Sequence, residues 1–292
     1  MKTYINPEKS VWNELTSRPA LEQAQLNEVI DDIFKKVELN QDKALINFTK
    51  EFDGVELTSL LVPEEEINEA TDLIDGTLKK AISTAKANIE KFHRSQKTSP
   101  VKIETSPGGF CWQEARPIEK VGLYIPGGSA PLFSTVLMLA APAKLAGCQE
   151  LVLCTPPDKN GKVHPAILFA AKLAGIDKIV RVGGAQAIAA LTLGTESVPA
   201  VYKIFGPGNQ FVTAAKLKAQ QNGIAIDMPA GPSELLVLAD GSANPVFVAS
   251  DLLSQAEHGP DSQVICVSDS EATLLAILDQ VKEQLEVLPR KS

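Results

Sequence analysis

Apolar and polar positions divide the chain into a helical N-terminal part and a longer part in which short apolar runs alternate with helices. Within residues 21–50 the apolar positions that share one helix face are Leu26, Val29, Ile30, Ile33 and Phe34. A second helical pattern runs over 63–92, where a proline and acidic residues favour the first turn. Residues 101–115 alternate on either side of Ser-Pro-Gly-Gly at 106–109, which predicts a β-hairpin with a loop of about four residues.

Residues 121–231 repeat one theme, a short apolar run followed by a turn and a helix. The predicted strands are 121–125, 151–154, 178–182, 203–205 and 224–227, and the predicted helices are 132–146, 164–174, 185–193 and 210–221. Short apolar strands that alternate with helices predict a parallel sheet covered on both faces, and therefore an α/β fold. The pattern resumes with strand 234–239, helix 245–257, strand 263–267 and helix 271–288.

Shifts in composition suggest where the domains begin. Residues 116–120 (Arg-Pro-Ile-Glu-Lys) have the character of a linker between the hairpin and the first apolar strand. We expect an N-terminal arm at 1–20, a first α/β domain made of 21–120 together with 232–292, and a second α/β domain at 121–231. The length of 292 residues agrees with about two domains.

Composition and charge exclude several classes of protein. Hydrophobic residues make up 44% and charged residues 22% of the chain, as in ordinary soluble globular proteins. The formal net charge is -8 and no basic patch stands out, so we expect no nucleic-acid partner. No apolar run approaches the ~20 residues of a membrane span, and the N-terminus lacks the apolar core of a signal peptide. We therefore expect no membrane association and a cytoplasmic location.

Three of the predicted strands in 121–231 end in glycine and proline, at 126–128, 183–184 and 206–208. Ligands of open parallel sheets bind beyond the carboxyl ends of the strands, where helix N-termini attract anions. These turns are therefore candidates for a dinucleotide's pyrophosphate, although each glycine pair alone is equally typical of a tight turn. Residues 206–208 lack the third glycine of the dinucleotide fingerprint, and no acidic residue about 20 positions further on stands out as a ribose ligand.

The helix predicted over 245–257 brings two polar side chains to its last turn. Gln255 and His258 are three residues apart and therefore share one face. The helix then ends at Gly259 and Pro260. An imidazole and an amide oxygen in that arrangement are suitable ligands for Zn²⁺. The alternative is a histidine that interacts with the helix dipole beside a solvated glutamine.

Ser233 and Glu234 lie at the junction between the two predicted domains, where clefts for small molecules are common. Capping or hydrogen bonding within a loop explains both residues equally well. The remaining histidines, His93 and His164, stand near the end and the start of predicted helices, so we do not expect them to bind metal.

Five stretches carry the most distinctive patterns of the chain. They are 122–132 (GLYIPGGSAPL), 182–189 (VGGAQAIA), 204–209 (IFGPGN), 226–234 (IDMPAGPSE) and 251–258 (DLLSQAEH). Together they resemble the histidinol dehydrogenase family, and the resemblance extends over essentially all 292 residues. It implies a fold of two incomplete Rossmann-like domains with parallel sheets, preceded by an N-terminal helical region, in a homodimer.

By this resemblance the chain takes part in the zinc-dependent, NAD-linked oxidation of L-histidinol to L-histidine, the last step of histidine biosynthesis. The family makes two successive hydride transfers through an aldehyde-level intermediate. Gln255 and His258 would be zinc ligands that also lie against the substrate, and Ser233 would contact the substrate. The positions that match NAD contacts of the family are Tyr124, Gln186 and Asn209.

Family chains extend well past the position equivalent to Ser292. The resemblance assigns to that extension two further zinc ligands, an aspartate and a histidine, and a glutamate–histidine pair that transfers protons. We therefore expect no catalytic residue within these 292 residues, and no turnover of histidinol by them alone. Two alternatives stay open. One is a dehydrogenase of the same family for another small alcohol, and the other is a non-catalytic binding protein that keeps the fold and the NAD cleft.

Overall fold

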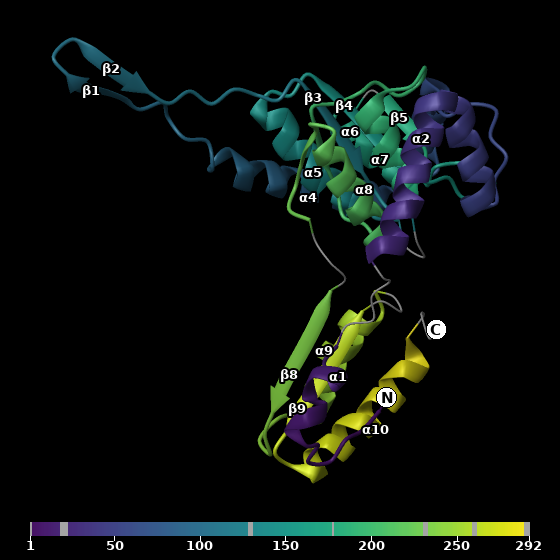
Figure 1. Cartoon of the computed structure of the whole chain (residues 1–292), viewed down its shortest axis with the longest axis vertical. Coiled ribbons are helices and arrows are strands. Elements are labelled where there is room, and N and C mark those ends of the chain that lie inside the picture. Colours follow the sequence, from purple (N-terminus) through teal and green to yellow (C-terminus); the bar gives the residue numbers. More distant parts are fainter. Residues whose placement is uncertain are drawn as a thin grey trace. The chain divides into compact units, whose positions relative to one another are not determined.

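The computed structural model describes residues 2–17, 23–127, 131–176, 178–229, 233–258 and 262–288. The chain forms two compact units (Figure 1). The larger unit comprises residues 24–230, and the smaller unit combines residues 1–23 with 231–292. Within the described residues, no helix is both long enough and apolar enough to cross a membrane.

A five-stranded parallel sheet forms the centre of the larger unit, with the strand order β5-β4-β3-β6-β7. Its strands are β3 (Lys120–Tyr124), β4 (Glu150–Thr155), β5 (Lys178–Arg181), β6 (Lys203–Phe205) and β7 (Ala225–Ile226). Each of them lies within two residues of the predicted position. The predicted parallel α/β sheet is thus confirmed.

Helices cover both faces of this sheet, which explains why its strands are apolar throughout rather than alternating. In β4, Leu151 and Leu153 point to one core, whereas Val152 and Cys154 point to the other. The helices that contribute to the first core are α5 (Phe133–Ala146) and α6 (Pro165–Leu173), and those that contribute to the second are α7 (Gly184–Leu193) and α8 (Gln210–Gln221).

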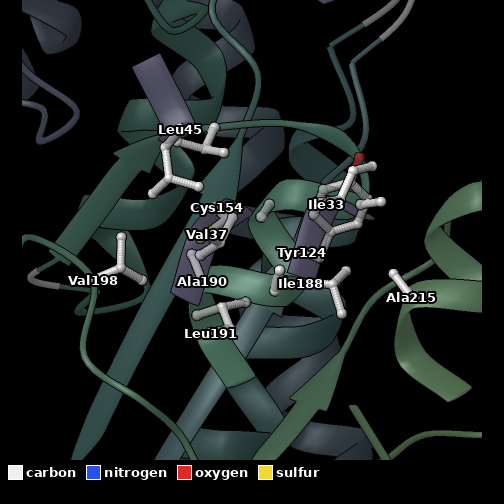
Figure 2. Close-up of a cluster of buried hydrophobic side chains, with 14 of the residues drawn as sticks. Ile33, Val37, Leu45, Tyr124, Cys154, Ile188, Ala190, Leu191, Val198 and Ala215 are labelled. Atoms are coloured by element: carbon white, nitrogen blue, oxygen red, sulfur yellow. The ribbon is translucent and has the colours of Figure 1, made fainter. Parts of the chain in front are cut away.

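The N-terminal helices complete these two layers. Helix α2 (Gln23–Phe48) packs with α7 and α8, whereas α3 (Glu64–Asp72) and α4 (Gly76–Arg94) pack with α5 and α6. Figure 2 shows Ile33, Val37 and Leu45 of α2 beside Tyr124 and Cys154 of the sheet. The structure thus groups 24–120 with the sheet of 121–230, whereas the sequence suggested a domain of 21–120 with 232–292. Helical periodicity shows that a helix has a buried face, but it does not show which sheet that face covers.

Two local features also differ from the sequence-based expectation. The helical pattern over 63–92 is interrupted, because the Asp75 carboxylate accepts the N–H groups of Thr77 and Leu78 and so begins a new helix, α4. The hairpin of β1 (Lys102–Ser106) and β2 (Gly109–Trp112) has a two-residue turn rather than a loop of about four residues. Gly108 has a φ of +78° in that turn, a conformation that glycine adopts without steric cost.

The smaller unit contains a two-stranded parallel sheet of β8 (Glu234–Ala239) and β9 (Gln263–Ser268). Helices α9 (Pro245–Ala256) and α10 (Glu271–Val287) pack on it, and the short helices η1 (Lys9–Val11) and α1 (Trp12–Leu15) precede it in the sequence. The core residues of this unit are Ala239, Val248, Ala249, Leu252, Leu253, Ile277 and Val281. The strand–helix–strand–helix order predicted from residue 234 onward is confirmed.

Candidate functional site

The carboxyl ends of β3 and β6 form a topological switch point in the larger unit. The chain passes from β3 to β4 and β5 on one side, and then returns to β6 on the other side of β3. The segments after β3 and β6 therefore lead to helices on opposite faces of the sheet, and a crevice opens between such segments in open α/β folds. Tyr124 ends β3, and the sequence Gly-Pro-Gly-Asn at 206–209 follows β6.

The backbone of these segments is packed so closely that glycine is required. Gly206 has a φ of +142°, and a Cβ added there would lie 2.1 Å from the carbonyl oxygen of Tyr124. Gly127 and Gly183 press on Pro156 in the same way, with hypothetical Cβ atoms 2.5 and 2.6 Å from its ring. The ends of β3, β4, β5 and β6 are therefore in direct contact with one another.

Tyr124 provides a neutral hydroxyl at this place. Its Oη accepts a hydrogen bond from the N–H of Gly184 over 3.0 Å, in the first turn of α7. Burial, with smaller contributions from the nearby Cys154 and Asp53, raises the pKa of Tyr124 to about 12, although the hydrogen bond from Gly184 acts in the opposite direction. The phenol therefore keeps its proton at neutral pH and can donate it to an acceptor on a ligand. Asp53 is a neighbour that the sequence did not suggest.

Gln186 lies in the same first turn of α7 and is only 2% exposed. A Cβ added at Gly184 would lie 2.6 Å from Gln186 Oε1, so the amide folds back over the helix start. The φ of Gly184 is +63°, which also favours glycine. Tyr124 Oη, the Gly184 N–H and the Gln186 amide thus form one polar cluster.

Asn209 occupies the N-cap of α8 and is exposed. Its Oδ1 accepts the N–H groups of Phe211 and Val212, each over 3.1 Å. These bonds fix the orientation of the side chain, so its Nδ2 donor points away from the two N–H groups that Oδ1 accepts. A donor beside a helix N-terminus, next to a glycine turn, suits an anionic ligand. The structure therefore brings Tyr124, Gln186 and Asn209 to the same carboxyl edge of the sheet.

Two charged residues beside this edge were not predicted from the sequence. Asp227 follows β7, and its Oδ2 accepts the N–H of Gly206 over 2.8 Å. Lys216 on α8 donates to the carbonyl oxygen of Gly206 over 2.9 Å. Asp227 lies 21 residues after Gly206 and ends a predicted strand, and this position was the available signal. Its carboxylate binds the backbone of the glycine turn. The spacing expected of an acidic ribose ligand does not reveal this contact.

The other three predicted site residues lie in the smaller unit, at the amino end of its sheet. Ser233 directly precedes β8, and its carbonyl oxygen accepts the N–H of Gln263 over 3.3 Å. Gln255 is half-buried near the end of α9, and its Nε2 donates to Ser262 Oγ over 3.4 Å. Helix α9 runs back along the sheet, so its end returns to where β8 begins. This topology brings Ser233 and Gln255 to one end of the unit.

His258 is exposed two residues after α9, and its N–H donates to the carbonyl oxygen of Gln255 over 3.2 Å. This turn keeps the two residues together at the helix end. The bond to Ser262 engages the nitrogen of the Gln255 amide, so its oxygen is the atom suited to a metal. An imidazole and an amide oxygen fit part of a zinc shell. The predicted helix end at Gly259 and Pro260 lies outside the described residues.

A complete metal site is not found in the described residues, where no group of three or more His, Cys, Asp and Glu side chains lies close enough to hold an ion. His164 is the N-cap of α6, with Nδ1 accepting the N–H of Ala166 over 3.2 Å. His93 lies near the end of α4, where its Nδ1 is 2.7 Å from Gln96 Oε1. Both histidines therefore stand at helix ends, as the sequence suggested.

Known proteins resemble the chain over nearly its whole length. The family model described as histidinol dehydrogenase matches residues 16–292. The histidinol dehydrogenase of Bacteroides thetaiotaomicron is 60% identical over 291 residues, which cover 100% of this chain and 68% of that relative. The corresponding enzyme of Vibrio parahaemolyticus is 51% identical over 291 residues, covering 96% of this chain and 67% of the relative.

Solved structures agree with this result. The crystal structure of histidinol dehydrogenase from Elizabethkingia anophelis has a TM-score of 0.87 and 57% identity, covering 100% of this chain and 67% of that chain. A methylmalonate-semialdehyde dehydrogenase from Oceanimonas doudoroffii, at 15% identity and a TM-score of 0.51, shares the fold alone. From the family match and these close relatives, the chain belongs to the histidinol dehydrogenase family of oxidoreductases.

Proposed function

We propose that this chain binds NAD⁺ at the switch point of its five-stranded sheet, within a protein that oxidises L-histidinol to L-histidine in histidine biosynthesis. The observation that carries the proposal is the meeting of Tyr124, Gln186 and the 206–209 turn at one edge of the sheet. Open α/β sheets bind dinucleotides at such a point. Family membership supports the choice of histidinol as the substrate.

The residues at this edge suit different parts of the cofactor. The glycine turn allows close approach of the pyrophosphate to the positive dipole end of α8, with Asn209 Nδ2 as a donor, while Asn209 Oδ1 caps the N–H groups of Phe211 and Val212. The Tyr124 hydroxyl and the Gln186 amide, which are buried nearby, are suited to orient a polar group of the cofactor. Bound NAD⁺ would supply the hydride acceptor for two successive oxidations through an aldehyde-level intermediate.

The smaller unit is proposed to supply Gln255 and His258 as two zinc ligands that also touch the substrate, together with Ser233 as a substrate contact. Bound zinc would supply Lewis-acid polarisation of the substrate oxygen. Gln255 and His258 lie on one turn at the end of α9, so these two donors are close in sequence and in space. Because zinc sites have three or four protein ligands, we propose that further ligands complete this shell.

We also propose that the protein is a homodimer. Both strands of the β1–β2 hairpin expose apolar side chains, among them Ile103, Phe110 and Trp112. Exposed aromatic and aliphatic groups close together are typical of a surface that a partner covers. Analytical ultracentrifugation tests this part of the proposal, and a monomer at all concentrations would contradict it.

The NAD site is tested by exchanging its helix cap. Asn209→Ala removes both the cap and the proposed donor, so we expect a loss of about 1 kcal/mol in unfolding free energy and at least tenfold weaker NAD⁺ binding in calorimetry. Asn209→Asp keeps the cap acceptor but opposes the phosphates with a negative charge. It should therefore be stable and still bind NAD⁺ poorly.

Asn244→Ala is the matched control, because Asn244 caps α9 in the smaller unit through the N–H of Val246. It should lose similar stability and keep its NAD⁺ affinity. Equal NAD⁺ affinities in all four proteins would contradict the proposed site.

The reaction is tested with histidinol, NAD⁺ and Zn²⁺, with NADH formation as the signal. These 292 residues should show no turnover, because the resemblance assigns the proton-transfer pair and further zinc ligands to the part of family chains that follows. The enzyme of Bacteroides thetaiotaomicron is the positive control. Robust NADH formation by the 292 residues would reject the expected inactivity. A panel of other small alcohols with a full-length protein decides the substrate.

A further inference from the structure

Both polar atoms of the Gly206 backbone are held by charged side chains that come from different elements. Asp227 Oδ2 accepts the Gly206 N–H over 2.8 Å, and Lys216 Nζ donates to the Gly206 carbonyl oxygen over 2.9 Å. The Lys216 ammonium also forms an ion pair with Asp227 Oδ1. The three residues thus form a closed ring of polar contacts, which we call the Gly206 clamp.

The side chains of the clamp are less exposed than those of another ion pair on α8. The Lys216 side chain is 6% exposed and that of Asp227 is 27% exposed. On the same helix, Lys218 pairs with Asp31 over 2.6 Å, but these side chains are 32% and 59% exposed. Removing charges from water is costly, and buried pairs often stabilise a fold no better than apolar residues would. Stability alone is therefore a weak reason for placing this pair under a glycine turn.

The position of the clamp suggests a different role. Gly206 lies against the Tyr124 carbonyl oxygen, at a φ that other residues rarely adopt. Gly206 follows the last residue of β6, and its N–H and C=O are bonded to the side chains of Asp227 and Lys216. Fixing both groups sets the direction in which the chain leaves β6. That direction determines where residues 207–209 and the first N–H groups of α8 point.

We propose that Lys216 and Asp227 are positioning residues, which hold the 206–209 turn in the shape that receives the pyrophosphate of the dinucleotide. The proposal rests on NAD⁺ binding at the switch point, as proposed above. The two side chains act through the backbone of Gly206 and do not themselves touch the cofactor. Loss of either charge lets the turn move, and bound phosphates then lose donors that were already in place.

The test measures NAD⁺ affinity by calorimetry in Lys216→Met, Asp227→Asn and the double variant. Each single variant should bind NAD⁺ at least tenfold more weakly than the unmodified chain. The double variant should be no more than about threefold weaker than the weaker single variant, because residues that act as one unit are not additive. Asp227→Asn keeps the side-chain size and an acceptor for Gly206, so it supplies the test if Lys216→Met does not fold.

Two controls separate positioning from stability. Lys218→Met removes the exposed ion pair on the same helix and should change NAD⁺ affinity less than twofold. Leu168→Ala opens a cavity in the opposite core, so it should lower the thermal midpoint and leave NAD⁺ affinity unchanged when measured well below that midpoint.

The outcomes are distinct. Clamp variants that fold and bind NAD⁺ as tightly as the unmodified chain would overturn the positioning role alone. An equal loss of affinity in Leu168→Ala would also overturn it, because general destabilisation would then explain the effect. Absence of NAD⁺ binding in the unmodified chain would reject the proposed cofactor site, and the positioning role together with it.

Discussion

The two sheets of this protein place their polar residues in opposite ways. In the larger unit, which is built around a five-stranded sheet, Tyr124 and Gln186 are buried, and a hydrogen bond from the Gly184 N–H holds the Tyr124 hydroxyl. In the smaller unit, Ser233 and His258 are exposed at the amino end of a two-stranded sheet. Even strands of equal length differ, because β4 is buried almost throughout whereas Leu236 and Leu238 of β8 are exposed.

This contrast shows how differently the two proposed sites, one in each unit, are prepared for a ligand. The edge of the larger sheet where we propose that NAD⁺ binds is shaped by close backbone contacts, such as Gly206 against Tyr124. A site of that kind is preorganised, and a ligand does not have to order it. The proposed zinc-ligand turn, formed by Gln255 and His258, holds two donors near each other but leaves His258 exposed to solvent. Further groups are needed to fix its geometry.

The largest effect is expected where the backbone is tightest. In Gly206→Ala, backbone strain and overpacking against the Tyr124 carbonyl oxygen should together cost ~4 kcal/mol or more of unfolding free energy. Gly223→Ala is the control, since its φ is also positive, at +85°, but open space surrounds it. It should cost only ~1 kcal/mol, from the conformation alone. Denaturant titration measures both, and equal losses would contradict the tight packing.

A pair of leucine substitutions compares the two sheets directly. Leu153 of β4 is 0% exposed and Leu238 of β8 is 77% exposed. Leu153→Ala should cost about 3 kcal/mol, because it leaves a cavity between packed layers. Leu238→Ala should change the unfolding free energy by less than ~0.5 kcal/mol, as at other surface positions. A large loss in Leu238→Ala would mean that this side chain is covered in solution.

A small change in stability is also expected at the proposed zinc-ligand turn. His258→Ala should alter the unfolding free energy by less than ~0.5 kcal/mol, because the side chain is exposed. Its effect should appear instead in zinc binding. The 292-residue chain should retain less than one zinc per molecule after dialysis, and His258→Ala still less, because two ligands seldom hold the ion. Stoichiometric zinc in the dialysed chain, measured by atomic absorption, would contradict this expectation.

Much of the candidate site was accessible from local sequence. Asparagine before a helix predicts a cap, and Asn209 is one. Glycine at strand ends predicts close backbone contacts, and Gly206 makes one. The role of Asp227 was not accessible in this way, because its partners Gly206 and Lys216 are distant in sequence. An acid after a strand is as consistent with a solvated residue as with a buried clamp.

The sequence by itself determined most of the secondary elements and their order, although not the break between α3 and α4, because hydrophobic periodicity, caps and turn residues act over a few positions. It also determined the family, because the distinctive motifs are short continuous stretches of sequence. Tertiary structure alone decided that α2, α3 and α4 cover the sheet of β3 to β7, and that Lys216 and Asp227 meet at Gly206. These outcomes depend on which apolar faces match in shape and on bonds between distant residues, and neither is encoded in a local pattern.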